Sequence, residues 1–207
     1  MKKLYTLAVA LFSTLAIAQT NGGFEDWTDG APAPWTIILG SNGGSITQST
    51  STFHSGSSAV ALTAPTGTGN NRIQYIDIDV TEGQSCTISY WYNDNDNNAR
   101  FRHWGSFRNS EGALASGLQP AAFQPSTYNA NTSGWQQVTV NATAPTGATS
   151  LRVDFRVFQQ ANDASRGTVY LDDVIITPNT ASIKDNAIPG LSIYPNPVTD
   201  GTLNIKT

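Results

Sequence analysis

Short segments in which apolar and polar residues alternate run along most of the chain, and clusters of Gly, Pro, Asn and Ser separate them. Alternation with a period of two places apolar side chains on one face of a β-strand, and no segment keeps the period of a helix. The segments that predict strands are 35–39, 58–64, 72–80, 85–94, 99–108, 134–143, 149–159 and 167–177. They predict an all-β fold, an antiparallel β-sandwich or jelly roll with a short C-terminal β segment. The longest connection, Ser110–Asn131, exceeds the usual loop length, so we expect it to be functional or mobile.

The first residues, 1–18, have the pattern of a secretory signal peptide. Two lysines precede the apolar stretch Leu4–Ala18, which ends in Ala16-Ile17-Ala18, a cleavage site of small residues. A buried helix is the alternative, but this stretch is uniformly apolar instead of amphipathic. No apolar run approaches the roughly 20 residues of a membrane span. We therefore predict a mature protein without a transmembrane segment, secreted or at the cell surface.

Composition and charge narrow the choice of partner. Charged residues make up 13% of the chain, against roughly 25% in an average soluble protein. The formal net charge is −4, and −4 − 2 = −6 once the two lysines of the signal are removed, which argues against a nucleic-acid partner. Lysine is absent between Lys3 and Lys184, so arginine supplies every positive side chain in between. The single cysteine, Cys86, cannot form an intrachain disulfide, so stability has to come from the core or from a metal.

A linker and a second unit follow the alternating region. Residues 179–189 lose the alternation, as a linker does, and 190–207 places two apolar strands around Tyr194-Pro195-Asn196-Pro197. Two such strands cannot bury a core. The segment resembles the opening of a type A sorting domain of the type IX secretion system. The resemblance implies a domain truncated after Thr207 and export by the type IX secretion machinery; a plain interdomain turn is the alternative.

Four short motifs in the region 20–178 carry a second resemblance. In chain order they are Asn21-Gly22-Gly23-Phe24-Glu25, Ser55-Gly56-Ser57-Ser58-Ala59-Val60, Gly134-Trp135 and Tyr170-Leu171-Asp172-Asp173-Val174. In this order and spacing they resemble the jelly-roll carbohydrate-binding modules of families four and nine, in the galactose-binding-like superfamily. The resemblance implies a noncatalytic domain that binds a glycan.

The two outer motifs also suggest a metal site. If the terminal strands lie side by side, Glu25 and Asp172 converge, and carboxylate oxygens suit Ca²⁺. The resemblance implies a structural calcium held by Glu25 and Asp172, with backbone oxygens from Gly22 and from the turn His54–Ser57. Alternation places Asp173 on the opposite face from Asp172. In the alternative reading, Glu25 faces water and the two aspartates merely end a strand.

The same alternation predicts a binding surface. In each of the segments 85–94, 99–108 and 149–159, one set of alternate residues is apolar and the other faces outward. If the three strands share one sheet, the outward side chains line a single face: Trp91, Arg102, Trp104, Arg152, Asp154 and Arg156. Aromatic rings stack on sugar rings, and arginine binds vicinal hydroxyls, carboxylate or sulfate with two hydrogen bonds. This predicts a polysaccharide-binding face. The alternatives are a ladder of surface ion pairs and a one-residue shift in register, which would turn both tryptophans into the core.

Nothing in the sequence nominates a catalytic centre. His54 and His103 are the only histidines, and no nucleophile motif or paired-histidine metal motif accompanies them. Adjacent strand residues such as Asp172 and Asp173 do not form a general acid/base pair when they point to opposite faces. We therefore predict a secreted, noncatalytic carbohydrate-binding module stabilised by calcium. The alternative is a cell-surface adhesion or structural module without affinity for sugars.

Overall fold

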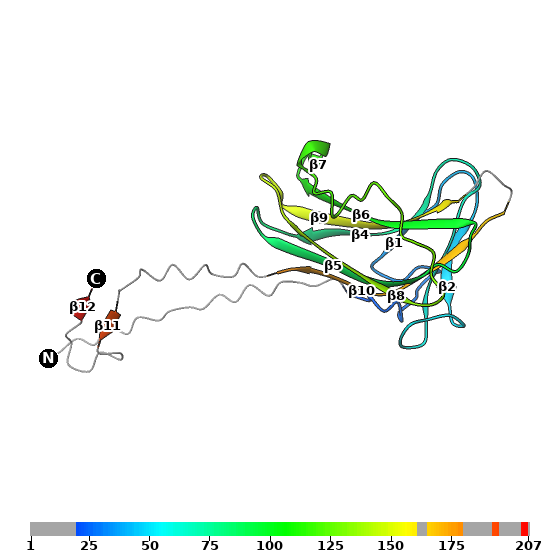
Figure 1. Ribbon diagram of the computed structural model, residues 1–207, viewed down its shortest axis with the longest axis horizontal. Helices are drawn as coiled ribbons and strands as arrows, with labels where there is room; N and C mark the ends of the chain where they lie inside the picture. The colour runs from blue at the N-terminus through cyan, green and yellow to red at the C-terminus, as the bar shows by residue number, and fades with distance from the viewer. Residues whose placement is uncertain (1–19, 161–164, 180–191, 195–203, 207) are drawn as a thin grey trace.

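The structure, a computed structural model, describes residues 20–160, 165–179, 192–194 and 204–206. Its main body is a sandwich of two antiparallel sheets (Figure 1). The first sheet has the strand order β1 (Thr36–Ile38), β4 (Asn71–Asp79), β9 (Ser150–Gln159), β6 (Ala99–Asn109) and β7 (Gly112–Ala113). The second sheet has the order β2 (Ser45–Ser49), β3 (Ala59–Thr63), β10 (Thr168–Pro178), β5 (Ser85–Asn93) and β8 (Gln136–Thr143). The all-β sandwich predicted from alternation is thus confirmed.

The core forms where alternate residues of the two sheets meet. In β9, Leu151, Val153, Phe155 and Val157 are all 0% exposed, as the alternation predicts. The Phe155 ring lies 4.9 Å from the Tyr90 ring of β5, so aromatic contacts join the two layers. Cys86, 0% exposed, is a small buried residue of the same core.

Two β-bulges interrupt the alternation. One lies in β4 between Tyr75 and Ile78, and the other lies in β10 between Asp172 and Ile175. A bulge inserts an extra residue and re-aims the side chains around it. Both bulges therefore limit how far a strict period of two predicts the faces of these strands.

The sequence-based strands match the structure except at two places. The strand β2 and the two-residue β7 were not predicted, and the long connection Ser110–Asn131 contains β7 and a 3₁₀ turn, η1 (Ser116–Leu118). The expectation that 85–94, 99–108 and 149–159 share one sheet is wrong, because β5 pairs with β10 and β8 while β6 pairs with β9. Alternation defines the faces of a strand but does not say which sheet the strand joins.

The ends of the chain are described only in part. The predicted signal peptide lies outside the described residues, and so does nearly all of the predicted linker. In the C-terminal segment, β11 (Ser192–Tyr194) pairs antiparallel with β12 (Asn204–Lys206). The part of the chain that the structure describes holds no helix with the length and apolar character needed to span a membrane.

Candidate functional site

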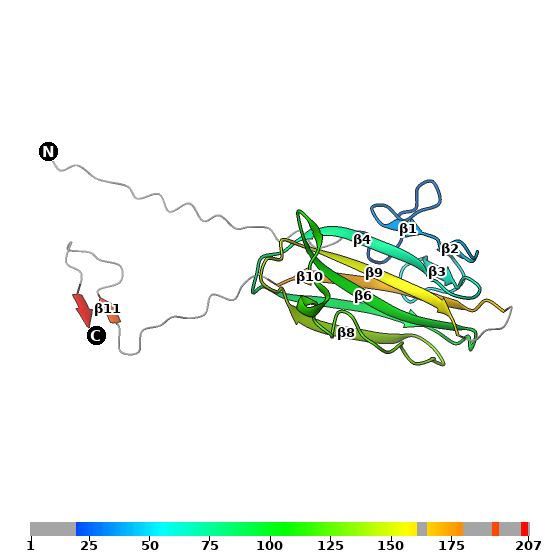
Figure 2. The same ribbon diagram turned by 90° about the horizontal axis from the view of Figure 1, so that it is seen from above.

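Five of the six predicted glycan-binding residues lie together on the outer face of the first sheet. Cross-strand pairing sets them in rows, and Figure 2 shows β4, β9 and β6 side by side. One row runs Gln74–Asp154–Trp104, the next runs Arg72–Arg156–Arg102, and Arg100–Phe158 and Arg152–Ser106 flank them. We call these rows the arginine face. The sixth residue, Trp91, lies on β5 in the second sheet and is not part of it.

Asp154 lies at the centre of the arginine face and is 0% exposed. Arg156 donates to Asp154 Oδ2 from Nε at 3.1 Å and from Nη2 at 2.6 Å, and Gln74 Nε2 donates to Oδ1 at 2.6 Å. Arg152 and Arg72 approach the same carboxylate at 3.5 and 3.8 Å. The arginines therefore form an ion-pair network around Asp154, which is the alternative that the sequence left open. The Asp154 oxygens point at protein groups. Asp154 positions the arginines, and it is not exposed to a ligand.

Arginines outnumber carboxylates in these rows. Among the described side chains of the arginine face, Asp154 is the carboxylate set against Arg72, Arg100, Arg102, Arg152 and Arg156. Burial lowers the pKa of Arg156, and the hydrogen bonds to Asp154 oppose that effect. A guanidinium stays charged in proteins even so. The face therefore concentrates positive charge in a chain whose net charge is negative.

Aromatic rings separate and support these guanidinium groups. The Arg102 and Arg156 guanidiniums each lie 4.8 Å from the centroid of the Trp104 ring. Tyr128 belongs to the long connection. The guanidiniums of Arg100 and Arg102 lie 4.4 and 4.8 Å from the centroid of its ring. Arg102 Nη1 also donates to Pro125 O at 3.0 Å. These contacts hold the long side chains in one orientation. The result is an ordered surface of alternating cations and rings.

Sequence reasoning did not single out Tyr128, although it singled out the connection that carries it. This connection runs along the edge of β6: Gly105 N–H donates to Phe123 O at 2.7 Å, and Asn129 N–H donates to Phe101 O at 2.8 Å. A side chain at Gly105 would collide with the Phe123 ring, so the close approach requires glycine. The signal that could have identified Tyr128 from the sequence is an aromatic residue in an unusually long loop.

The predicted calcium ligands lie near the second sheet, and both contact one turn. Glu25 accepts hydrogen bonds from the Ser57 amide and hydroxyl and from the Ser58 amide. Asp172, 0% exposed, accepts the amides of His54 at 2.8 Å and Ser55 at 3.1 Å. The hydrogen bonds from Ser57 lower the pKa of Glu25, whereas burial raises the pKa of Asp172. The two carboxylates thus hold neighbouring parts of the turn 54–58.

Asp173 also reaches this turn, which corrects the prediction that it faces away from Asp172. At the bulge of β10 its φ is 46°, and its carboxylate contacts His54 Nδ1 at 2.6 Å and Ser55 Oγ at 2.7 Å. The left-handed backbone breaks the alternation that would separate the two side chains. Both aspartates therefore serve the same turn.

The hydrogen bonds of Glu25 and Asp172 determine whether these carboxylates can also hold a calcium ion. No group of three or more His, Cys, Asp or Glu side chains that could hold a metal occurs in the described part of the chain. Glu25 and Asp172 already accept N–H and O–H donors, but a carboxylate has about four lone-pair sites and can accept further partners. With only two acidic ligands, a calcium here would depend on backbone oxygens, which Ca²⁺ accepts. The donor set is compatible with calcium.

The outer face of the second sheet carries its own aromatic cluster. The His54 ring stacks on Trp91 with centroids 3.9 Å apart, and Trp135 meets His54 edge-on at 5.7 Å. Trp91 is therefore outward, as alternation predicts, but it is partly covered by His54. The His54 and Asp173 side chains are each 27% exposed.

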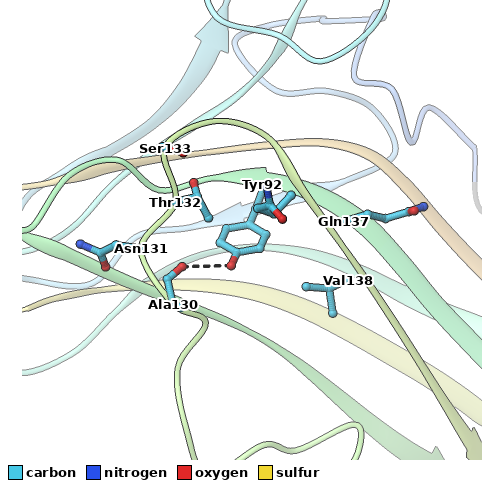
Figure 3. A pocket seen from close by; sticks show the side chains of 8 residues that line it. Tyr92, Ala130, Asn131, Thr132, Ser133, Gln137 and Val138 are labelled. Carbon is cyan, nitrogen blue, oxygen red and sulfur yellow. Dashed lines mark hydrogen bonds between the residues drawn. The ribbon is translucent and has the colours of Figure 1, made fainter.

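A pocket of about 370 Å³ lies beside β8, and its lining residue Gln137 pairs across the strands with Trp91. Figure 3 shows its lining, with the Tyr92 hydroxyl donating to Ala130 O at 3.0 Å. The other lining residues are Asn131, Thr132, Ser133, Gln136, Gln137 and Val138. The pocket is walled by β5, β8 and the loop before β8, not by the arginine face.

The sandwich is similar in fold to several solved structures. One is the enzymatically active domain of bacteriophage CBA120 tailspike protein 4, with 17% identity, a TM-score of 0.55 and coverage of 76% of this chain and 21% of that one. Another is the CBM22-1 xylan-binding domain of Paenibacillus barcinonensis Xyn10C, with 14% identity, a TM-score of 0.52 and coverage of 80% and 96%. A third, from work on the promiscuous specificity of carbohydrate-binding modules of the β-sandwich superfamily, has 19% identity, a TM-score of 0.51 and coverage of 74% and 60%.

These likenesses establish the class of fold, a jelly-roll-like β-sandwich. The chain spans only about a fifth of the tailspike chain, whereas the xylan-binding domain is matched over nearly its whole length. No protein-family model matches the sequence, and no curated protein matches it.

Proposed function

We propose that this protein is a noncatalytic carbohydrate-binding module that holds an acidic polysaccharide on the arginine face. The observation that carries the proposal is the set of five arginines ordered by Trp104, Tyr128 and one buried carboxylate. Guanidinium groups bind carboxylate or sulfate through paired hydrogen bonds, and aromatic rings stack on sugar C–H faces. The names of two of the similar structures, a xylan-binding domain and carbohydrate-binding modules, support the same class.

The roles of the predicted site residues follow from their places. Arg102 and Arg156 both lie over the Trp104 ring, so the indole orders two guanidiniums that together bind the acidic substituents of a sugar. Arg152 extends the face along β9. Asp154 acts indirectly, because it fixes Arg156 and is itself buried.

The proposal places the protein outside the cell. The apolar segment 4–18 has the composition of a cleaved signal, and the resemblance of 190–207 to a type A sorting domain suggests export by the type IX secretion machinery. The resemblance to families four and nine is the finer assignment within the carbohydrate-binding class. In this proposal calcium is structural, held by Glu25 and Asp172, and it stabilises the turn 54–58.

Affinity electrophoresis through gels that contain a dissolved polysaccharide tests the proposal. The probes are polygalacturonate, a sulfated galactan and neutral xylan. We expect strong retardation by at least one acidic polymer, weaker retardation by xylan, and release as salt is raised, because guanidinium–anion pairs are screened. Retardation by xylan alone would contradict the acidic specificity. No retardation by any polymer would overturn glycan binding and favour an adhesion or structural module.

A further inference from the structure

A buried carboxylate without a partner lies at the end of β5. Asp94 is 0% exposed, and neither of its carboxylate oxygens has a hydrogen-bond partner. No ion pair joins Asp94 to a cationic side chain among the residues that the structure describes. The preceding residue adds a third such oxygen, since Asn93 Oδ1 is also buried and unpartnered. Buried polar atoms are otherwise almost always paired, so these three oxygens require an explanation.

A second carboxylate lies close to Asp94. Burial has the largest influence and raises the pKa of Asp94 to about 7; the charge of Asp96 adds to this effect, and the backbone N–H of Asp96 opposes it. A buried carboxylate with a second carboxylate two residues along the loop is costly unless a cation compensates it.

The surrounding loop is held in place by its own hydrogen bonds. The Asp94 amide donates to Thr132 Oγ1 at 2.9 Å, and the Thr132 amide donates to Asp94 O at 2.6 Å. Asp96 accepts the amides of Asn98 at 2.9 Å and Thr168 at 3.1 Å. The loop therefore joins β5, the 130–133 segment beside the pocket in Figure 3, and the start of β10. The backbone is fixed while the Asp94 side chain is left unsatisfied.

The chemistry of the loop selects the kind of ligand. Residues 93–98 read Asn-Asp-Asn-Asp-Asn-Asn, so every side chain offers an oxygen and none is cationic. Ca²⁺ takes six to eight oxygen ligands, including carboxylates, amide oxygens and backbone carbonyls, in flexible geometry. Side chains at alternate positions of such a loop, here 94, 96 and 98, are the pattern that opens known calcium loops.

We propose that the loop 93–98 binds a calcium ion through Asp94 and Asp96, with further oxygens from the loop. The ion neutralises the buried carboxylate and locks the loop to the 130–133 segment. This site is separate from Glu25 and Asp172, which contact the turn 54–58 at other strands. It does not depend on glycan binding.

Calorimetric titration of the chelator-treated full-length protein with CaCl₂, together with thermal unfolding in chelator and in calcium, tests the proposal. The variants are Asp94→Asn, Asp96→Asn and, as controls, Glu25→Gln for the other predicted site and Glu111→Gln for an exposed acid on the β6–β7 turn. We expect Asp94→Asn to bind one calcium fewer than the wild type. Calcium at about 100 times its dissociation constant should raise the Tm of the wild type by about 5 to 10 °C more than that of the variant.

The variant also carries an internal check on folding. Because Asp94→Asn removes an uncompensated buried charge, its Tm in chelator should equal or exceed that of the wild type, and the order should reverse in calcium. Loss of the same calcium in Asp96→Asn, with Glu111→Gln unchanged, would support the site. The proposal fails if Asp94→Asn binds as much calcium as the wild type, if only Glu25→Gln loses calcium, or if the wild type binds none.

Discussion

The outer faces of the two sheets differ in how their polar side chains are paired. On the second sheet, small neutral groups of β5 and β8 pair across strands: Thr87 Oγ1 donates to Asn141 Oδ1 at 2.6 Å, and Ser89 Oγ lies 3.0 Å from Thr139 Oγ1. On the first sheet, β9 and its neighbours hold arginines around a fully buried carboxylate. The neutral face satisfies its own groups, whereas the arginine face retains an excess of donors. The outer face of the second sheet therefore pairs its polar groups internally, whereas the arginine face has more donors than acceptors.

The largest expected difference between the faces is in stability. Asp154→Ala leaves the surrounding guanidiniums uncompensated, so we expect the free energy of unfolding to fall by about 3 to 5 kcal/mol. Ser89→Ala on the second sheet removes one neutral hydroxyl and should cost about 1 kcal/mol. Urea unfolding of both variants measures the difference. Equal losses would mean that Asp154 is no more than an ordinary polar residue.

The second difference is in binding. Trp104→Ala removes the ring that contacts both Arg102 and Arg156, and we expect the affinity for the retained acidic polysaccharide to fall by about 2 kcal/mol, roughly thirtyfold. Trp91→Ala is the matched control, because Trp91 lies on the second sheet against His54. Isothermal titration with an oligosaccharide of that polymer gives both values. If Trp91→Ala has the larger effect, the binding face has been assigned to the wrong sheet.

A smaller effect separates guanidinium geometry from charge alone. Arg102→Lys keeps the positive charge but loses the planar pair of donors, so affinity should fall by about 1 kcal/mol, roughly fivefold. Arg166→Lys makes the same change at an exposed arginine after β9, near Asn42 O. The control should bind like the wild type. Equal affinity of Arg102→Lys and the wild type would show that charge suffices at this position.

Sequence alone could predict the strands and their faces more securely than the way they assemble. Alternation in β9 is uninterrupted, so the inward row Leu151–Val157 and the outward arginines followed directly from it. The sheet to which β5 belongs depends on contacts distant in sequence, and for that reason Trp91 was grouped with the wrong neighbours. The bulge at Asp172 is a backbone feature with no composition signal, and it turned Asp173 toward Asp172.

The candidate sites show the same limit. The arginine cluster could be located because arginines recur at alternate positions in two strands, but the burial of Asp154 depends on Gln74, which a third strand supplies. The composition of the 93–98 loop was visible as a polar connection. Only the fold reveals that Asp94 is buried without a partner. A site whose residues come from one strand can be predicted from the sequence, whereas a site that depends on contacts between several strands cannot.

The smallest predicted difference concerns the two histidines, one buried behind the first sheet and one on the outer face of the second. His103 of β6 is 4% exposed, and its Nε2 lies 2.9 Å from Ala122 O, so Nε2 carries the proton and donates. In the neutral ring Nδ1 then accepts from the Tyr90 hydroxyl at 3.0 Å. Burial lowers the pKa of His103, and the contact with Ala122 O opposes this. His54, beside Asp173, is partly open to solvent.

The sign of the pH effect follows from this arrangement. As pH falls below about 6.5, the unfolded chain takes up a proton on this residue before the folded chain does, so folded stability is complete above that pH and is lost below it. One such proton contributes a slope of at most about 1.4 kcal/mol per pH unit. His103→Gln should therefore flatten the fall in unfolding free energy between pH 7 and 5, measured by urea unfolding. His54→Gln is the matched control, and the buried ring predicts the larger flattening for His103→Gln because desolvation penalises its charged form. If the two variants flatten the curve equally, or only His54→Gln does, then burial does not keep His103 neutral in the folded protein.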